Sequence, residues 1–300
     1  MMLCRKGISS GVRETVNRSP RKAMSMDKAG KEFWDAAWAA EDRPVSVDPL
    51  THGAQIHVHR RFDSYFRKIF AGIETHEARL LEIGCARSLW LPDFAREFGF
   101  EVTGLDFSEA GCEQEREILA RAEVKGEIIC ADFFAPPAEL LGSFDVIVSF
   151  GVAEHFTDTA QCLKAFSRFL KPGGLMLTSI PNLTGLPGLL AKTINRPVYD
   201  VHVPIDAEGL RGAHRLAGLK VLDCGFFMSS NFGVLNLNGI RRRSPSWLVK
   251  KIFLAMLVRL SRLVWLVEDH LTGEWEARSF TAPYINCIAR KERESLNEAL

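Results

Sequence analysis

The sequence predicts an α/β fold in which a doubly wound, mostly parallel sheet of seven strands carries helices on both faces. From about residue 50 onward, strand-like and helix-like hydrophobic periodicity alternates along the chain. The segment FDVIVSF, residues 144–150, is a largely apolar run, as expected for a strand buried on both faces of a parallel sheet. A proline and two glycines in LKPGG, residues 170–174, mark a turn between such segments.

Local patterns define the individual elements. Ser108 is a suitable N-cap for a helix over 108–122, because Glu109 and Glu113 place negative charge in or near its first turns. The other expected helices cover 54–72, 88–98 and 158–170. The expected strands cover 79–84, 101–106, 126–132, 144–150, 175–181, 218–227 and 282–291. Right-handed crossovers between parallel strands place the ligand site at the carboxyl ends of the strands.

Four regions are expected along the chain. Residues 1–30 are basic and poor in acids, and we interpret them as a disordered leader or an overlong start, with a transit peptide as the alternative. Residues 31–77 are expected to form an N-terminal helical cap. Residues 78–227 and 281–292 are expected to form the core, and residues 228–280 a helical insertion that serves as a lid.

Composition argues against several classes of function. The 300 residues are 47% hydrophobic and carry a formal net charge of +1, so no basic bias indicates binding to nucleic acid. The seven cysteines are scattered without a C-x-x-C pair, which argues against a disulfide framework or a zinc site and for a reducing, cytoplasmic compartment. The apolar runs near the C-terminus are interrupted by Arg259 and Arg262, so none is expected to span a bilayer. No pattern in the sequence requires a metal.

The first strand of the core leads into a loop that contains a glycine. In LLEIGCARSLW, residues 80–90, Gly84 follows the strand, but the second and third glycine positions of a dinucleotide fingerprint hold Ala86 and Leu89. Leu89 and the acidic Glu82 make the loop unsuitable for a pyrophosphate, whereas a cationic cofactor without phosphate would tolerate both. The loop therefore argues against a nicotinamide-dependent oxidoreductase, which is the least favoured alternative, and for an adenosyl cofactor such as S-adenosylmethionine.

Two further strands end in acids. Asp106 ends the second strand, where a carboxylate suits the diol of a ribose. Asp132 ends the third strand and is followed by Phe133 and Phe134, a combination that suits the amine and the face of an adenine ring.

Together these features resemble the class I S-adenosylmethionine-dependent methyltransferases, in particular the small-molecule enzymes of quinone biosynthesis. The resemblance covers about residues 78–182 and rests on the loop from Glu82 to Ser88, Asp106, Asp132-Phe133, FDVIVSFGVAEHF and LKPGG. Ala86 and Ser88 depart from it, because the family usually has glycines there. The resemblance implies a Rossmann-like fold and S-adenosylmethionine as the cofactor. The cofactor-binding residues that it implies are Glu82, Gly84, Ala86, Asp106, Phe107, Asp132, Phe133, Ser149 and Phe150.

The same resemblance implies a role for each group of residues. Glu82 orients the amino group of the cofactor, directly or through water. Asp106 holds the ribose and Asp132 the adenine amine, while the phenylalanines at 107 and 133 pack on the base. Ser149 and Phe150 lie near the sulfonium.

The methyl acceptor is less well specified. Methyl transfer requires alignment of acceptor, methyl group and sulfur, and it needs a base only where the nucleophile must lose a proton. His155, in the Glu-His pair after the fourth strand, is our candidate base or acceptor-orienting group, with packing against the next helix as the alternative. His202 is a second candidate, with an ordinary loop histidine as its alternative. We expect transfer to an oxygen of a small-molecule or lipid-like acceptor; a non-catalytic cofactor-binding protein is the alternative, which Ala86 and Ser88 would suit.

A basic and apolar stretch covers residues 241–267, with seven basic residues and no acid. On a helix, Lys251, Ala255, Arg259 and Arg262 share one narrow face. Two interpretations are open: an interfacial helix that contacts anionic headgroups and makes the protein peripheral to a membrane, or a lid helix packed on the core with its arginines extended to water. Either helix would wall one side of the acceptor pocket, but only the first predicts a lipid-like acceptor. The oligomeric state does not follow from the sequence.

Overall fold

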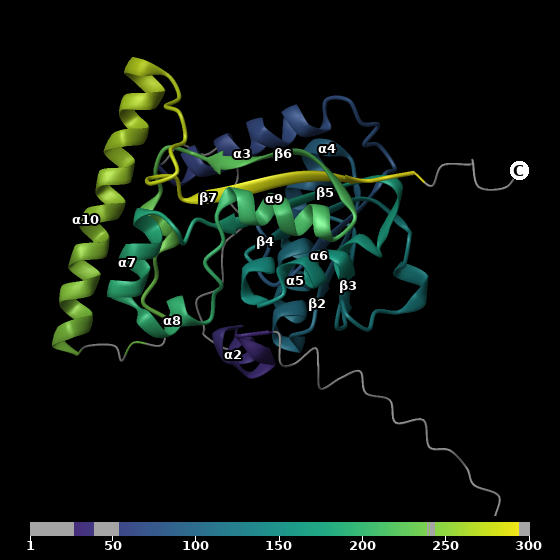
Figure 1. Cartoon of the computed structure of the whole chain (residues 1–300), viewed down its shortest axis with the longest axis horizontal. Coiled ribbons are helices and arrows are strands. Elements are labelled where there is room, and N and C mark those ends of the chain that lie inside the picture. Colours follow the sequence, from purple (N-terminus) through teal and green to yellow (C-terminus); the bar gives the residue numbers. More distant parts are fainter. Residues whose placement is uncertain (1–26, 39–53, 239, 241–243, 294–300) are drawn as a thin grey trace, which may run out of the picture.

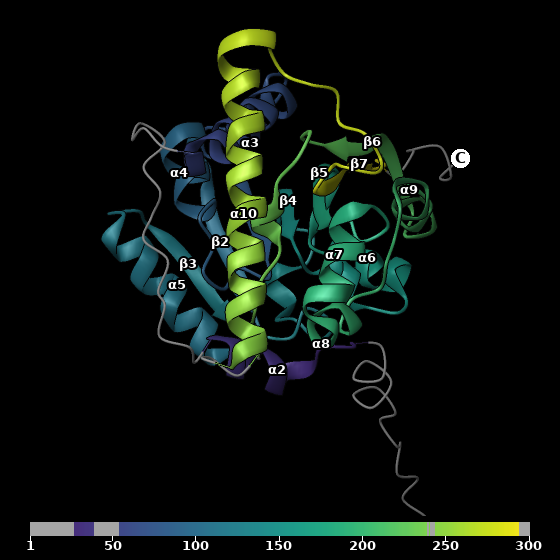
Figure 2. The ribbon, with the colours of Figure 1, turned by 90° about the vertical axis from the view of Figure 1, so that its left-hand side faces the viewer.

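The computed structural model describes residues 27–38, 54–238, 240 and 244–293 (Figure 1). The predicted leader lies outside the described residues except for its last positions, 27–30. In the described part, a sheet is covered by helices on both faces, and one long helix stands at the side of these layers (Figures 1 and 2).

The central sheet has the strand order β3-β2-β1-β4-β5-β7-β6. Its strands are β1 (Arg79–Ile83), β2 (Glu101–Asp106), β3 (Gly126–Cys130), β4 (Phe144–Phe150), β5 (Leu170–Pro181), β6 (Leu219–Phe227) and β7 (Tyr284–Lys291). β1 to β5 pair in parallel, whereas β7 runs antiparallel between β5 and β6. The predicted seven-stranded, mostly parallel sheet is confirmed. Because β1 pairs with both β2 and β4, the strand order reverses there and creates the switch point at which such sheets bind ligands.

Helices cover both faces of this sheet. They are α2 (Gly30–Trp38), α3 (Ala54–Phe70), α4 (Leu91–Phe98), α5 (Glu109–Arg121), α6 (Thr159–Ser167), α7 (Leu186–Ile194), α8 (Arg196–Asp200), α9 (Ala207–Leu216) and α10 (Pro245–Val267), with short helices η1 (Ala138–Leu140), η2 (Ala153–His155), η3 (Phe232–Val234) and η4 (Glu268–Thr272). One core lies between the sheet and α6 and α9, and includes the buried Phe166 and Leu210. The other lies under α3, α4 and α5, where the rings of Phe66 and Phe94 are 5.0 Å apart.

The boundary between α6 and β5 differs from the prediction. α6 ends at Ser167, before the predicted residue 170, and β5 already begins at Leu170 rather than at residue 175. Leu170 is buried and pairs with Phe144 of β4, and the register between the two strands shifts after that pair. Burial of Leu170 therefore extends the strand across Pro172, which local sequence rules assign to a turn.

Helix α10 lies beside α7 at the side of the layered core (Figure 1). It begins at Pro245, where the Ser244 hydroxyl accepts a hydrogen bond from the amide of Trp247 at 3.1 Å. The first residues of the predicted helix, 241–243, lie outside the described part of the chain. No helix among the described residues combines the length and the apolar character that crossing a membrane requires.

Candidate functional site

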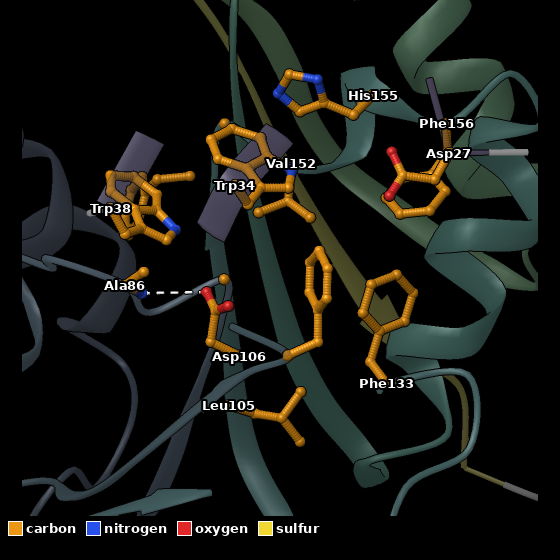
Figure 3. Close-up of a pocket in the computed structure, with 14 residues that line it drawn as sticks. Asp27, Trp34, Trp38, Ala86, Leu105, Asp106, Phe133, Val152, His155 and Phe156 are labelled. Carbon is orange, nitrogen blue, oxygen red and sulfur yellow. Dashed lines mark hydrogen bonds between the residues drawn. The ribbon is translucent and has the colours of Figure 1, made fainter. Parts of the chain in front are cut away.

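The carboxyl ends of β1, β2 and β4 border a cavity of about 140 Å³ (Figure 3). The predicted site residues that line it are Gly84, Ala86, Asp106, Phe107, Phe133, Phe150 and His155. These residues come from separate parts of the sequence, and the parallel pairing of the strands brings them to one edge of the sheet.

A second hollow, of about 540 Å³, adjoins this cavity and shares Phe107, Phe133 and Phe156 with it. The exposed Asp132 lines the second hollow. Small-molecule sites usually have volumes of about 300–1,000 Å³, so the first cavity alone is too small for a nucleoside cofactor. The two hollows together have the necessary room.

Asp106 is held in place by backbone amides on both of its carboxylate oxygens. Its Oδ1 accepts a hydrogen bond from the Ser108 amide at 2.8 Å and its Oδ2 one from the Ala86 amide at 3.2 Å (Figure 3). The side chain is only 7% exposed, and burial raises its pKa against the opposing effect of these amides. The carboxylate is therefore fixed at the cavity wall with lone pairs left to accept hydroxyl hydrogens.

Gly84 is the first residue of the loop after β1. Its φ is +81°, in the left-handed region, and a Cβ there would lie 2.3 Å from Cγ2 of Val152. Any other residue would be strained and would push Val152 out of place. The turn and its contact with Val152 therefore require glycine here, and the role of Gly84 in cofactor binding stays a prediction.

Buried carboxylates lie beneath the same loop. The Ser88 hydroxyl donates to Glu82 at 2.7 Å, and the Ser88 amide donates to Glu115 at 2.7 Å. Burial raises the pKa of Glu82 to about 8 and that of Glu115 to about 9. At neutral pH both groups are therefore largely protonated in the empty site, and a bound cation, unlike a phosphate, would favour their ionisation. Ser88, which stands where the family usually has glycine, has a definite structural role here.

Two predicted residues lie behind the cavity wall rather than in it. Glu82 is 2% exposed and Ser149 is fully buried, and neither lines the cavity in the described structure. The Ser149 hydroxyl has no hydrogen-bond partner among the described residues. These two side chains can therefore contact a ligand only if the wall residues shift slightly or if a water molecule bridges the gap.

Helix α2 covers the cavity with two tryptophans that are absent from the predicted site. Trp34 and Trp38 stack with ring centroids 5.5 Å apart, and Trp34 packs edge-on against His155 at 5.0 Å (Figure 3). The helix is tied to the core because the Ser108 hydroxyl donates to Asp35 at 2.7 Å. The four-residue spacing of the tryptophans in FWDAAW is the sequence signal that could have indicated this cap.

His155 lies on the opposite wall from Asp106. Its Nδ1 is 2.9 Å from the Val201 carbonyl, so the neutral ring donates there and keeps Nε2 as an acceptor. Burial, helped by the neighbouring His202, lowers the pKa of His155 to about 3. A residue with this pKa is a weak base at neutral pH, and the geometry therefore suits the orienting role better than that of a strong proton acceptor.

His155 belongs to a small group with Glu154 and His202. The ring centroids of the two histidines are 4.4 Å apart, so the second candidate lies directly behind the first. One ligand atom from each of the three residues lies within 4.8 Å of the others. Because two imidazoles and a carboxylate are common metal ligands, the expectation that no metal is needed remains a prediction.

The chain shows clear sequence similarity to known proteins. Residues 54–223 match the family described as a methyltransferase domain. Over 122 residues the chain is 35% identical to a ubiquinone biosynthesis O-methyltransferase from Caulobacter sp. (strain K31), covering 38% of this chain and 45% of that protein. Over 220 residues it is 32% identical to a protein of the same name from Ruegeria pomeroyi, covering 68% and 84% respectively. The chain spans about half the length of several curated relatives that it matches.

A structural comparison agrees on the fold. The crystal structure of geranyl diphosphate C-methyltransferase from Streptomyces coelicolor A3(2), in complex with S-adenosyl-L-homocysteine, superimposes with a TM-score of 0.57 and 16% identity. The match covers 87% of this chain and 97% of that one. It supports the predicted Rossmann-like architecture and, at this identity, nothing beyond the fold.

Proposed function

Because the chain belongs to the methyltransferase-domain family, within the class I S-adenosylmethionine-dependent enzymes, we propose that it transfers a methyl group from S-adenosylmethionine to an oxygen of a small-molecule or lipid-like acceptor. The observation that carries the proposal is the cavity itself. It combines a fixed carboxylate for a ribose with a neutral imidazole on the opposite wall, and the buried Glu82 lies behind the wall. The family assignment agrees with the predicted class and not with the nicotinamide-dependent alternative.

The predicted residues would hold the cofactor as follows. Asp106 accepts the ribose hydroxyls, and Asp132 accepts the adenine amine, with the phenylalanines at 107 and 133 against the base. Glu82 interacts with the amino group, directly or through water. The cofactor supplies an electrophilic methyl group on a sulfonium, and the protein supplies binding and alignment.

His155 would orient the acceptor. A hydroxyl that donates to its Nε2 points an oxygen lone pair into the cavity. As the oxygen–carbon bond forms and the carbon–sulfur bond breaks, the hydroxyl proton becomes strongly acidic, so that even a weakly basic imidazole can take it. A neutral thioether then leaves as S-adenosylhomocysteine. This sequence of events explains how a histidine with a depressed pKa still serves methyl transfer to oxygen.

The lipid-like class of acceptor has its own support. A small cavity of about 60 Å³ lies behind the histidines and is lined by His202 together with apolar residues, among them Leu183, Ile194, Val198 and Leu235. This cavity shares no lining residue with the cofactor cavity, so an acceptor at His155 would reach it only after the histidines between them moved. The relatives named for ubiquinone biosynthesis make a hydroxylated aromatic quinone precursor the first acceptor to test. We also propose that the protein acts in the cytoplasm and that the chain has the four regions predicted from its sequence.

The test uses the full chain with methyl-labelled S-adenosylmethionine and hydroxylated aromatics, each with and without an apolar tail. We expect S-adenosylhomocysteine and a labelled methoxy product, identified by mass spectrometry and by loss of the phenolic ionisation. Label on carbon or nitrogen would overturn the oxygen assignment. Cofactor binding without turnover of any acceptor, including cell extract, would favour the non-catalytic alternative.

His155 variants test the residue assignment within the same assay. His155→Ala should lower kcat by about 100-fold or more, the usual range for a group that handles a proton, and leave the dissociation constant of S-adenosylmethionine within about twofold. His155→Gln, which retains a hydrogen-bond acceptor, should recover part of the loss. Equal activity of the alanine variant and the wild type would remove His155 from the mechanism.

A further inference from the structure

Helix α10 packs on the rest of the protein through only one side (Figure 2). Ser261 and Trp265 are its buried residues. The Ser261 hydroxyl accepts from the Phe232 amide at 2.9 Å, and the Trp265 indole donates to the Ser230 carbonyl at 2.8 Å. Leu254 and Leu257, on the same side, pack against the small apolar cluster of α7 and η3. The inner side of the helix is therefore held to the core by hydrogen bonds and apolar packing.

The outer side of α10 is apolar as well. Val249, Ile252, Met256, Leu260 and Leu263 follow one another at spacings of three or four residues and are 67%, 54%, 60%, 49% and 63% exposed. Further exposed apolar residues on this helix are Leu248, Phe253 and Leu266. A helix of a monomeric protein normally presents charged and polar residues to water, so a continuous apolar stripe of this length indicates a surface that is covered in use.

Basic residues border this stripe on one edge. Lys251, Arg259 and Arg262 are exposed and follow one another along the neighbouring row of the helix. α10 contains no acidic residue from Pro245 to Val267, and in the described part of the chain no carboxylate forms an ion pair with any of these three cations. The partner of this surface must therefore be apolar in its interior and negatively charged at its boundary.

We propose that the outer face of α10 docks onto the surface of an anionic phospholipid bilayer. The helix lies in the plane of the headgroups, its leucines and Phe253 enter the acyl boundary, and the basic row meets phosphates. A second copy of this chain fits less well, because a two-fold interface on this face would bring two basic rows together without an acid to neutralise them.

The position of this face relative to the cavities gives it a functional consequence. Figure 1 shows α7 beside α10, and Leu189 of α7 is 58% exposed. α7 also lines the small apolar cavity behind the histidines, through Pro187, Ala191 and Ile194. A bilayer against α10 would therefore lie close to this small apolar cavity. Docking itself requires no methyl transfer, so its test is independent of the proposed function.

Vesicle sedimentation of the full chain tests the proposal, with phosphatidylcholine vesicles that contain or lack phosphatidylglycerol. We expect the wild type to bind the anionic vesicles and to be released by high salt. Arg259→Glu with Arg262→Glu should weaken binding by about thirtyfold or more, since each basic residue near such a surface contributes about 1 kcal/mol. Ile252→Ser with Met256→Ser should weaken it by at least about tenfold.

The control pair is Leu216→Ser with Leu222→Ser, because these residues are 79% and 49% exposed on α9 and β6. This pair should leave vesicle binding within about twofold of the wild type, and unchanged thermal unfolding of all three variants shows that the fold persists. Absence of wild-type binding, or an equal loss in the control pair, would overturn the proposal. Light scattering without vesicles provides a second check. A wild-type dimer that the double substitution Ile252→Ser with Met256→Ser converts to a monomer would also overturn the proposal.

Discussion

The Asp106→Asn substitution tests the cofactor site at a residue that the structure fixes through both carboxylate oxygens. The wild-type carboxylate accepts one backbone amide on each oxygen, from Ser108 at 2.8 Å and from Ala86 at 3.2 Å. Asparagine has the same shape but only one acceptor oxygen. Its amide group must therefore turn N–H toward one of the two backbone donors or toward a ribose hydroxyl.

The size of the effect follows from these contacts. A hydrogen bond to a charged group contributes about 1.5–3 kcal/mol. Loss of one such bond to the ribose corresponds to an increase of about 10- to 150-fold in the dissociation constant of S-adenosylmethionine. The unpaired backbone amide, in a site that is 7% exposed, should also reduce the free energy of unfolding by about 1–3 kcal/mol.

Titration calorimetry of the cofactor and a thermal unfolding curve separate the two effects. Asp145→Asn is the matched control: Asp145 also accepts a backbone amide, from Arg79 at 3.0 Å, and pairs with Lys171 at 2.7 Å at the other end of the sheet. This control should lower stability by about 1 kcal/mol and leave cofactor affinity unchanged. A dissociation constant for Asp106→Asn within about twofold of the wild type would refute the ribose assignment.

Three further predictions concern the site and the core. Because burial holds the pKa of Glu82 at about 8 and a cationic cofactor favours the ionised form, affinity for S-adenosylmethionine should rise as the pH increases toward about 8 and level off above it, with release of a proton on binding below that pH. Calorimetry in two buffers of different ionisation enthalpy measures this release, and Glu82→Gln should abolish it. Trp34→Ala should weaken cofactor binding by about tenfold, because Trp34 lines the cavity and its ring covers the ligand. Trp34→Phe should retain most of the affinity, and equal affinity of all three proteins would show that α2 is only a surface helix. Phe166→Ala should lower the free energy of unfolding by about 3–5 kcal/mol, because the ring is fully buried and its centroid lies 4.9 Å from that of Phe133. Urea titration measures this loss, and a value below about 1 kcal/mol would contradict the assignment of the core.

Local sequence was sufficient for most of the strands and for the residues that end them. Burial on both faces makes β4 an apolar run, and the residue after a parallel strand reaches the carboxyl edge of the sheet whatever the neighbouring helices do. Gly84, Asp106 and Phe133 could therefore be assigned to one cavity from their positions at the strand ends alone. Ser108 was equally predictable, because N-capping depends only on its own helix: its hydroxyl accepts the Gly111 amide.

Features that depend on contacts between distant segments could not be predicted in this way. Trp34 and Trp38 reach the cavity because α2 is held against the core in the folded chain, by Ser108 and by Gln114, whose side chain donates to the Trp38 carbonyl at 2.6 Å. Glu115 has no distinguishing pattern in sequence, yet the Ser88 amide holds it under the cofactor loop. Leu170 continues β5 because its side chain is buried, although the following proline and glycines indicate a turn.

The sequence by itself determined the α/β class, the order of the strand ends and the unsuitability of the loop for phosphate, since periodicity and residue type act over a few neighbouring positions. The tertiary structure decided which buried groups change their protonation, that His155 is neutral and weakly basic, and that α10 keeps an apolar face that no other described residue covers. These properties depend on burial, and burial is set by segments that are far apart in the chain and meet only when it folds.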